Sequence, residues 1–202
     1  AEARAIADAK LNAVLAMTDD PINNLVLAKT AEDLVAAHEQ GKGALILGFQ
    51  NARILGTAVS GLDEFYAAGV RVFALTHMGH NDFADSSRPI FSAATGKHEV
   101  IEEHGGLSEL GRQAIVKFNS LGAIVDVSQL SKAATLQVIS LSNQPVISSH
   151  PNVHSLSAVS RNLSDEEIDI ITDSVVVVHV APFIGYLFSS SDKVLDREFL
   201  PA

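Results

Sequence analysis

The chain has 202 residues, which is enough for one well-packed domain and short for two. Its 24 acidic and 14 basic residues give a formal net charge of −10, which disfavours nucleic acid and anionic lipid as partners. The absence of cysteine excludes disulfides, thiolate nucleophiles and cysteine-ligated zinc within the chain. No apolar run has the length of a transmembrane segment, so we expect a soluble protein, either cytoplasmic or exported from a bacterial cell.

The first predicted element is an amphipathic helix over residues 1–17, in which one face carries the apolar side chains Ile6, Leu11, Val14 and Leu15. This stretch lacks the basic start and the unbroken apolar run of a signal peptide, so we expect it to belong to the fold. A turn is predicted at 19–21. A second helix is predicted from Thr30, which forms a capping pair with Asp33.

Five short apolar runs are predicted to be strands, at 44–49, 72–75, 123–127, 145–147 and 175–180. Helical patterns separate most of them, at 62–68, 107–121, 131–141 and 164–173, and two of these helices begin at good caps, Ser131 and Ser164. Apolar strands that alternate with helices are typical of a parallel sheet covered by helices. No repeat or linker divides the chain, so one domain is predicted over residues 1–202.

Polar side chains follow the predicted strands on their carboxyl sides, namely Gln50 and Asn51, His77, Asp126 and Gln129, and His150. In parallel α/β folds the loops after the strands converge at that edge and hold the active site. One histidine at a strand end is as readily a residue bonded to the backbone as a functional one. Two histidines at matching places favour function, so the spacing predicts a parallel α/β domain with a histidine-bearing site.

Other histidines have ordinary interpretations. The motif at 80–82 has the H-x-D form of a metal site, but it lies beyond a strand end, where a solvated loop is favoured. His154 would share a metal with His150 only on a helix, which Pro151 disfavours. His179, within the strand-like sequence VVVVHV, is predicted to be a buried and satisfied residue.

Two further polar features are weak signals on their own. Without other information, Arg161 is interpreted as one partner of a surface ion pair. Ser148 and Ser149 next to His150 raise the alternative of serine catalysis, but no G-x-S-x-G elbow surrounds them.

Three segments resemble the membrane (renal) dipeptidase family: ALTHMGHNDFADSS, GGLSELGRQAIVKFNSLGAIVDVSQLS and QPVISSHPNVHSLSAVSRNLSDEEI. Members of that family are zinc-dependent dipeptidases built on a (β/α)8 barrel. The resemblance implies a TIM-barrel-like parallel barrel, of which this chain is the central and later part, because such barrels typically need about 250 residues and eight strands. It also implies a dipeptide or a related small-molecule amide as the substrate, and it leaves a homo-oligomer open.

The resemblance assigns roles to three residues. The family holds two zinc ions, which polarise the scissile carbonyl and lower the pKa of a shared water. His77 matches the histidine that contacts the substrate and the tetrahedral intermediate. Arg161 matches the substrate-binding arginine, and His150 matches one of the zinc-ligand histidines.

Two other positions depart from the family pattern. Gln50 stands where the bridging glutamate is expected, and Gln129 stands where the other ligand histidine is expected. A neutral amide oxygen is a much poorer zinc ligand than a carboxylate. The first-strand H-x-D pair and the late catalytic aspartate have no counterpart among the 202 residues.

Three hypotheses follow from this pattern. The leading one is a metal-dependent dipeptidase that uses a metal-activated water. The second is a barrel that has lost its metal site and binds a peptide-like or amino-acid ligand. The third is a one-metal hydrolase of another small amide or ester.

Overall fold

The computed structural model describes residues 2–172 and 176–187. Its centre is a five-stranded parallel sheet in the order β3–β4–β7–β8–β9. This sheet confirms the predicted parallel α/β architecture. The strands are β3 Leu47–Gln50, β4 Val70–Ala74, β7 Ile124–Asp126, β8 Val146–Ser148 and β9 Val176–Val178.

A helix lies between each pair of successive strands of this sheet, as the alternating patterns predict. The helices are α3 Gly61–Ala67, α4 Glu109–Leu121, α5 Lys132–Leu141 and α6 Asp165–Thr172. Both predicted caps are present, because Ser131 Oγ accepts from the Ala134 N–H at 3.2 Å and Ser164 Oγ accepts from the Glu167 N–H at 3.3 Å. Residues 173 and 175, at the edges of a predicted helix and a predicted strand, lie outside the described residues. Across 2–172 and 176–187, no helix has both the length and the apolar character that crossing a membrane requires.

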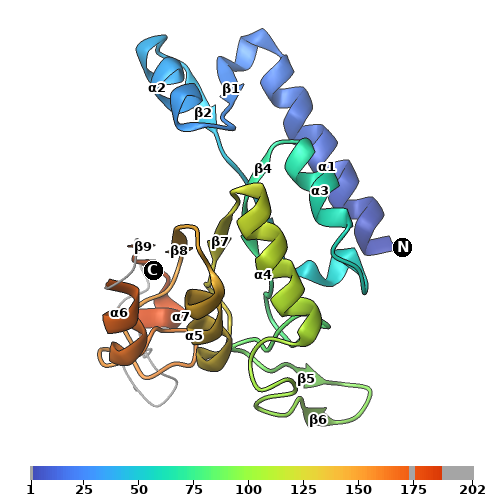
Figure 1. Ribbon diagram of the computed structural model, residues 1–202, viewed down its shortest axis with the longest axis vertical. Helices are drawn as coiled ribbons and strands as arrows, with labels where there is room; N and C mark the ends of the chain where they lie inside the picture. The colour runs from blue at the N-terminus through green and yellow to red at the C-terminus, as the bar shows by residue number, and fades with distance from the viewer. Residues whose placement is uncertain (1, 173–175, 188–202) are drawn as a thin grey trace, which may run out of the picture.

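The N-terminal residues form an arm at one end of the molecule (Figure 1). Helix α1 (Glu2–Asp19) confirms the first predicted element. Leu11, Val14 and Leu15 pack against the core, and Ile6, which lines a cavity together with Leu11 and Val14, is 51% exposed.

The single strand predicted at 44–49 is wrong. Residues Gly43–Leu45 form β2, which pairs in parallel with β1 (Leu25–Leu27), a strand that the apolar pattern does not predict. The main sheet begins only at Leu47, and Ile46 between the two strands is 48% exposed. The apolar run 44–49 thus contributes strands to two different sheets. Its hydrophobicity alone does not show where one strand ends and the next begins.

Local turn and cap signals in the arm are confirmed. The predicted turn is the 3-10 helix η1 (Pro21–Asn23), which Asp20 caps by accepting from the Ile22 N–H at 3.0 Å. Helix α2 (Ala31–Glu39) starts with the predicted capping pair, in which Thr30 and Asp33 each accept from the backbone N–H of the other. These motifs depend on neighbours in sequence, so the sequence alone specifies them.

The core lies between the sheet and the helices that cover it. Phe49, Phe73 and Phe118, from β3, β4 and α4, have successive ring centroids 5.5 Å and 4.9 Å apart. Helix α4 approaches the preceding loop closely at Gly111, where any Cβ would overlap the carbonyl oxygen of Phe83. This packing fixes the strands whose carboxyl ends carry the predicted site.

A long loop joins β4 to α4 and is fastened at its centre by Asp85, which is completely buried. The carboxylate accepts from the backbone N–H groups of Glu103, His104 and Gly106 at 2.9–3.1 Å. Burial by itself would raise the pKa of Asp85, but these hydrogen bonds outweigh it and lower the pKa below its usual value. The loop is therefore held by an ionised carboxylate.

The tip of this loop is the hairpin of β5 (Phe91–Ser92) and β6 (Lys97–His98), at the end of the molecule opposite the arm (Figure 1). The apolar pattern does not predict this hairpin. Phe91 on its surface is 56% exposed.

The solvated loop predicted at 80–82 is wrong for its first two residues. His80 is 3% exposed and Asn81 is 9% exposed, and only the aspartate that follows is exposed. The Nδ1 atom of His80 accepts from the Ser86 N–H at 3.0 Å, and Nε2 donates to the Val100 carbonyl oxygen at 2.8 Å. These bonds tie the two ends of the hairpin loop together, so the motif is structural.

The prediction that His179 is buried is also wrong. Its side chain is exposed, and its backbone N–H donates to the Ser148 carbonyl oxygen at 2.9 Å just beyond β9. Among the described strands, β9 has one hydrogen-bonded neighbour, β8. A strand that pairs with another strand on one side only leaves side chains in and next to it exposed, even where the sequence is apolar.

Candidate functional site

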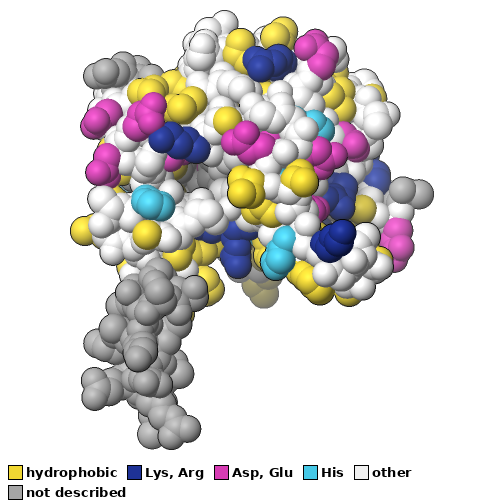
Figure 2. Space-filling view, turned by 90° about the horizontal axis from the view of Figure 1, so that it is seen from below, with side chains coloured by type: hydrophobic (Ala, Val, Ile, Leu, Met, Phe, Trp, Pro, Cys, Tyr) yellow, Lys and Arg dark blue, Asp and Glu magenta, His cyan; other side chains and the backbone are white. Residues whose placement is uncertain are grey.

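The candidate site lies at the carboxyl ends of the central strands. Gln50 ends β3, His77 follows β4, Gln129 follows β7 and His150 follows β8. Arg161, from the loop between β8 and α6, donates from Nη2 to the His150 carbonyl oxygen at 3.3 Å. The charges of Arg161 and His77 both influence the His150 imidazole. The structure thus gathers the predicted residues around one mouth, which lies at the end of the molecule that Figure 2 views.

His150 is oriented by a chain of hydrogen bonds that begins at Asp126. The Asp126 carboxylate accepts from the Ser149 hydroxyl and, through Oδ1, from the backbone N–H groups of Ser128 at 2.9 Å and Ser149 at 3.1 Å. Because the Ser149 hydroxyl hydrogen goes to the carboxylate, its oxygen accepts from His150 Nδ1 at 2.6 Å. His150 therefore carries its proton on Nδ1 and presents a lone pair on Nε2.

That lone pair is already engaged by Gln129. The Nε2 amide group of Gln129 lies 2.9 Å from His150 Nε2, and that of Gln50 lies 3.5 Å away. Gln129 is 6% exposed and adopts a left-handed backbone conformation (φ 73°), which is costly for a residue other than glycine. The backbone carbonyl oxygen of Gln129 accepts from Thr76 Oγ1 at 2.8 Å and from the Ser87 N–H at 2.9 Å. These two bonds hold this conformation in place.

The neutral form of His150 is favoured. Burial is the largest cause that lowers its pKa below the usual 6.5. The positive charge of Arg161 lowers the pKa further and His77 does so to a smaller extent, whereas the Asp126 carboxylate opposes them. An imidazole that stays neutral keeps its Nε2 lone pair as an acceptor.

Arg161 is a buried cation, so its interpretation as a surface ion pair is wrong. It is 5% exposed, and its Nε and Nη1 atoms have no hydrogen-bond partner. Its guanidinium lies 4.7 Å from the ring centre of Tyr186. Burial is the main cause that lowers its pKa, and among the described residues no carboxylate forms an ion pair with it. A buried guanidinium with two free donors is suited to a ligand that brings acceptors.

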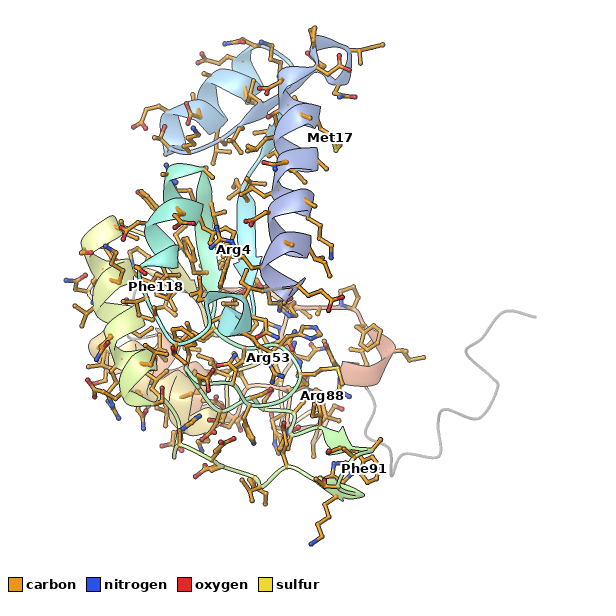
Figure 3. The ribbon with its side chains drawn as sticks, turned by 90° about the vertical axis from the view of Figure 1, so that its right-hand side faces the viewer. Arg4, Met17, Arg53, Arg88, Phe91 and Phe118 are labelled. Carbon is orange, nitrogen blue, oxygen red and sulfur yellow. The ribbon has the colours of Figure 1, made fainter. Side chains whose placement is uncertain are left out.

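Two further arginines lie on the same side of the molecule. Arg53, from the 3-10 helix η2 (Ala52–Leu55), donates from Nη2 to the His80 carbonyl oxygen at 2.6 Å. Figure 3 shows Arg88 between Arg53 and the hairpin residue Phe91. The charge of Arg88 lowers the pKa of Arg161. The positive charge of Arg88 thus acts on Arg161, and the negative charge of Asp126 acts in the opposite direction.

His77 follows Thr76 at the rim of the mouth, and its side chain is exposed. Its carbonyl oxygen accepts from Ser86 Oγ at 2.6 Å, so its backbone is fixed while its ring is free to meet a ligand. The neighbouring Thr76 is fully buried and belongs to the support of Gln129.

The described residues do not fit the two-zinc centre that the family pattern implies. Zinc would need the Nε2 lone pair of His150, which accepts from Gln129, and the Asp126 carboxylate is occupied by Ser128 and Ser149. Gln50 and Gln129 offer only neutral amide groups. Within 2–172 and 176–187, no group of three or more histidine, aspartate or glutamate side chains is placed to hold a metal.

A parallel α/β sheet with helices between its strands and polar residues at its carboxyl edge is the arrangement of a TIM-barrel-like fold. The sequence model of the membrane dipeptidase family (peptidase family M19) matches residues 2–197, and the chain belongs to that family. The dipeptidase aclJ of Aspergillus oryzae is 32% identical over 149 residues, which are 72% of this chain and 32% of that protein. The dipeptidase tcpJ of Claviceps purpurea is 30% identical over 165 residues, 82% of this chain and 36% of that protein.

Solved structures agree in fold. The probable dipeptidase PvdM of Pseudomonas aeruginosa is 39% identical with a TM-score of 0.87, over 93% of this chain and 46% of that chain. A metallopeptidase of Rhodobacter sphaeroides, bound to a phosphinate mimic of the dipeptide L-Ala-D-Ala, shares the fold at 24% identity and a TM-score of 0.78, over 89% of this chain and 49% of that one. The chain thus spans about a third of these curated relatives and about half of these solved structures.

Sequence reasoning missed the part that Asp126 and Ser149 play together. The sequence places Asp126 at a strand end and Ser149 beside His150, but 23 residues separate the two, and only the pairing of β7 with β8 brings them into contact. Ser149 is not arranged as a nucleophile, because its hydroxyl donates to the carboxylate and not to the imidazole. His154 lies in a turn, as its neighbouring proline predicts, and does not join His150 in a helical pair.

Proposed function

We propose that the protein is a dipeptidase-type hydrolase that acts on a dipeptide or a related small amide with a free carboxylate. The observation that supports this most directly is Arg161, a buried guanidinium with two unpaired nitrogens beside His150. A substrate carboxylate supplies the acceptors that the protein does not. The chain spans less than half of these relatives, so the activity is proposed for the whole protein.

In this proposal each residue of the mouth has a separate task. Arg161 binds the carboxylate and so positions the amide bond. His77, whose ring is exposed at the rim, donates a hydrogen bond to the oxygen of the reacting carbonyl as negative charge develops there. Zinc, which the family's metal dependence implies, has no place among the ligands described, so we assign no step to it.

The second candidate function is ligand binding without hydrolysis. The Gln129–His150 hydrogen bond favours it, because it occupies the lone pair that a second metal would use. Product analysis of the full-length protein with a panel of dipeptides separates the two candidates. Free amino acids in the product support the hydrolase, whereas saturable binding with no product supports the binding protein.

The test of carboxylate recognition compares a dipeptide with its C-terminal amide on the full-length protein. We expect the acid to be preferred and Arg161→Gln to weaken its binding by about 100-fold, because a buried charge pair is lost. The variant loses the hydrogen bond to the His150 carbonyl oxygen and the contact with Tyr186, so its stability should fall modestly, and thermal unfolding checks that it stays folded at the assay temperature. Equal affinity for acid and amide in the unaltered protein would reject the proposal.

A further inference from the structure

A cavity of about 580 Å³ opens beside the candidate site, between the long β4–α4 loop and the starts of α5 and α6. Gln129 and Arg161 both line it, so it continues directly from the mouth that holds His150. Its volume lies within the range of about 300–1,000 Å³ that small-molecule sites occupy. A carboxylate bound at Arg161 alone fills only a small part of it.

The charged side chains that line this cavity fall into two groups. Lys132 forms an ion pair with Glu166 at 2.6 Å, and Glu167 accepts from the N–H and the hydroxyl of Ser164, so these charges are already paired. Arg161 and Glu102 are different. Among the described residues, nothing forms a hydrogen bond or an ion pair with the Glu102 carboxylate, and Arg161 has two unpaired nitrogens.

The position of Glu102 is fixed by the loop on either side of it. The Val100 carbonyl oxygen accepts from buried His80, and the Glu103 N–H donates to buried Asp85 at 2.9 Å. The exposed carboxylate of Glu102 is therefore held at the wall of the cavity although nothing in the described chain binds it. The same cavity is also lined by the apolar side chains of Pro89, Ile101, Leu130 and Leu163.

We propose that this cavity selects a substrate whose carboxylate-bearing residue has a long basic side chain. The inference rests on the proposed function, in which Arg161 holds the carboxylate. The methylene stem of a lysine-like side chain suits the apolar part of the lining, and its ammonium group pairs with Glu102. Arg161 thus binds the negative group and Glu102 binds the positive group of the same residue.

The test compares two dipeptides on the full-length protein, alanyl-lysine and alanyl-norleucine, which differ in that the lysine ammonium is absent from norleucine. Relative kcat/KM is measured in competition, or Kd by calorimetry if the ligands are bound and not cleaved. We expect a preference of about three- to fivefold for the lysine dipeptide, the size of a partly exposed ion pair, and its loss in Glu102→Gln.

The matched control is Glu103→Gln, which removes the same charge one residue away, outside the cavity wall. This variant should keep the preference. If Glu102→Gln keeps it as well, or if both variants lose it equally, the inference is wrong although carboxylate recognition by Arg161 stands. If neither dipeptide binds to any form, the inference fails together with the proposed function.

Discussion

Hydrogen bonds hold the His150 imidazole at each of its two ring nitrogens. The family pattern does not predict this combination of partners. Asp126 and Ser149 fix the proton on Nδ1, and Gln129 engages Nε2 at 2.9 Å. In many enzymes, hydrogen bonds to the second ring nitrogen of a histidine orient it as a metal ligand. Here the oriented imidazole engages the side-chain amide of Gln129.

The two glutamines allow a prediction of what happens when the glutamate and the histidine of the family pattern are introduced in their place. Gln50→Glu together with Gln129→His places a carboxylate and a second imidazole beside His150, so the full-length protein should gain about one zinc ion per chain. Metal analysis after equilibration with zinc measures the gain. His150→Asn added to the double variant should abolish it, and a wild-type protein that already holds as much zinc would contradict the prediction.

Among the elements, the loop between β4 and α4 has the largest influence on the mouth. It carries His77 at its start, Arg88 near its middle and Glu102 close to its end, and buried Asp85 ties its two halves together. Irregular backbone of this length usually carries function, held in place by a rigid scaffold. The buried side chains of Asp85 and His80 bond to the backbone of the loop itself, which holds its two halves together.

Asp85→Asn should loosen this loop. The amide replaces an ionised acceptor of three backbone N–H bonds by a weaker acceptor, so the free energy of unfolding should fall by about 3 kcal/mol. Hydrogen exchange at the amides of Glu103, His104 and Gly106 should accelerate. Asp82→Asn, an exposed neighbour, is the control and should change neither quantity.

The same carboxylate gives the loop a dependence on pH. Because the folded state lowers the pKa of Asp85, its stabilising contribution is complete above the unfolded pKa of about 3.9 and is lost as pH falls through the folded pKa. The protection factors of the three amides, which correct for the intrinsic pH dependence of exchange, should therefore stay constant around neutral pH and fall only in acid.

For the whole molecule, the sequence predicted what depends on neighbours in the chain or on simple periodicity. This holds for the alternation of strands with helices in the central sheet, for the caps at Thr30, Ser131 and Ser164, and for the polar residues at the strand ends. Apart from the hairpin of β5 and β6, the features that were missed depend on long-range pairing. The division of one apolar run at Ile46 and the Asp126–Ser149 contact follow from which strands are neighbours in space, which local pattern does not encode.

The described part of the sheet also leaves apolar side chains uncovered at its β9 edge. Val177 is 55% exposed, Val180 68% and Phe183 55%, and in a closed barrel such an edge is paired with further strands. Residues 1–202 produced alone should therefore self-associate with rising concentration, as light scattering after size-exclusion chromatography will show. Val180→Lys should reduce this association, whereas Val116→Lys, at a position 65% exposed on α4, adds the same charge and should not. A 202-residue chain that stays monomeric at every concentration would show that the β9 edge does not drive self-association.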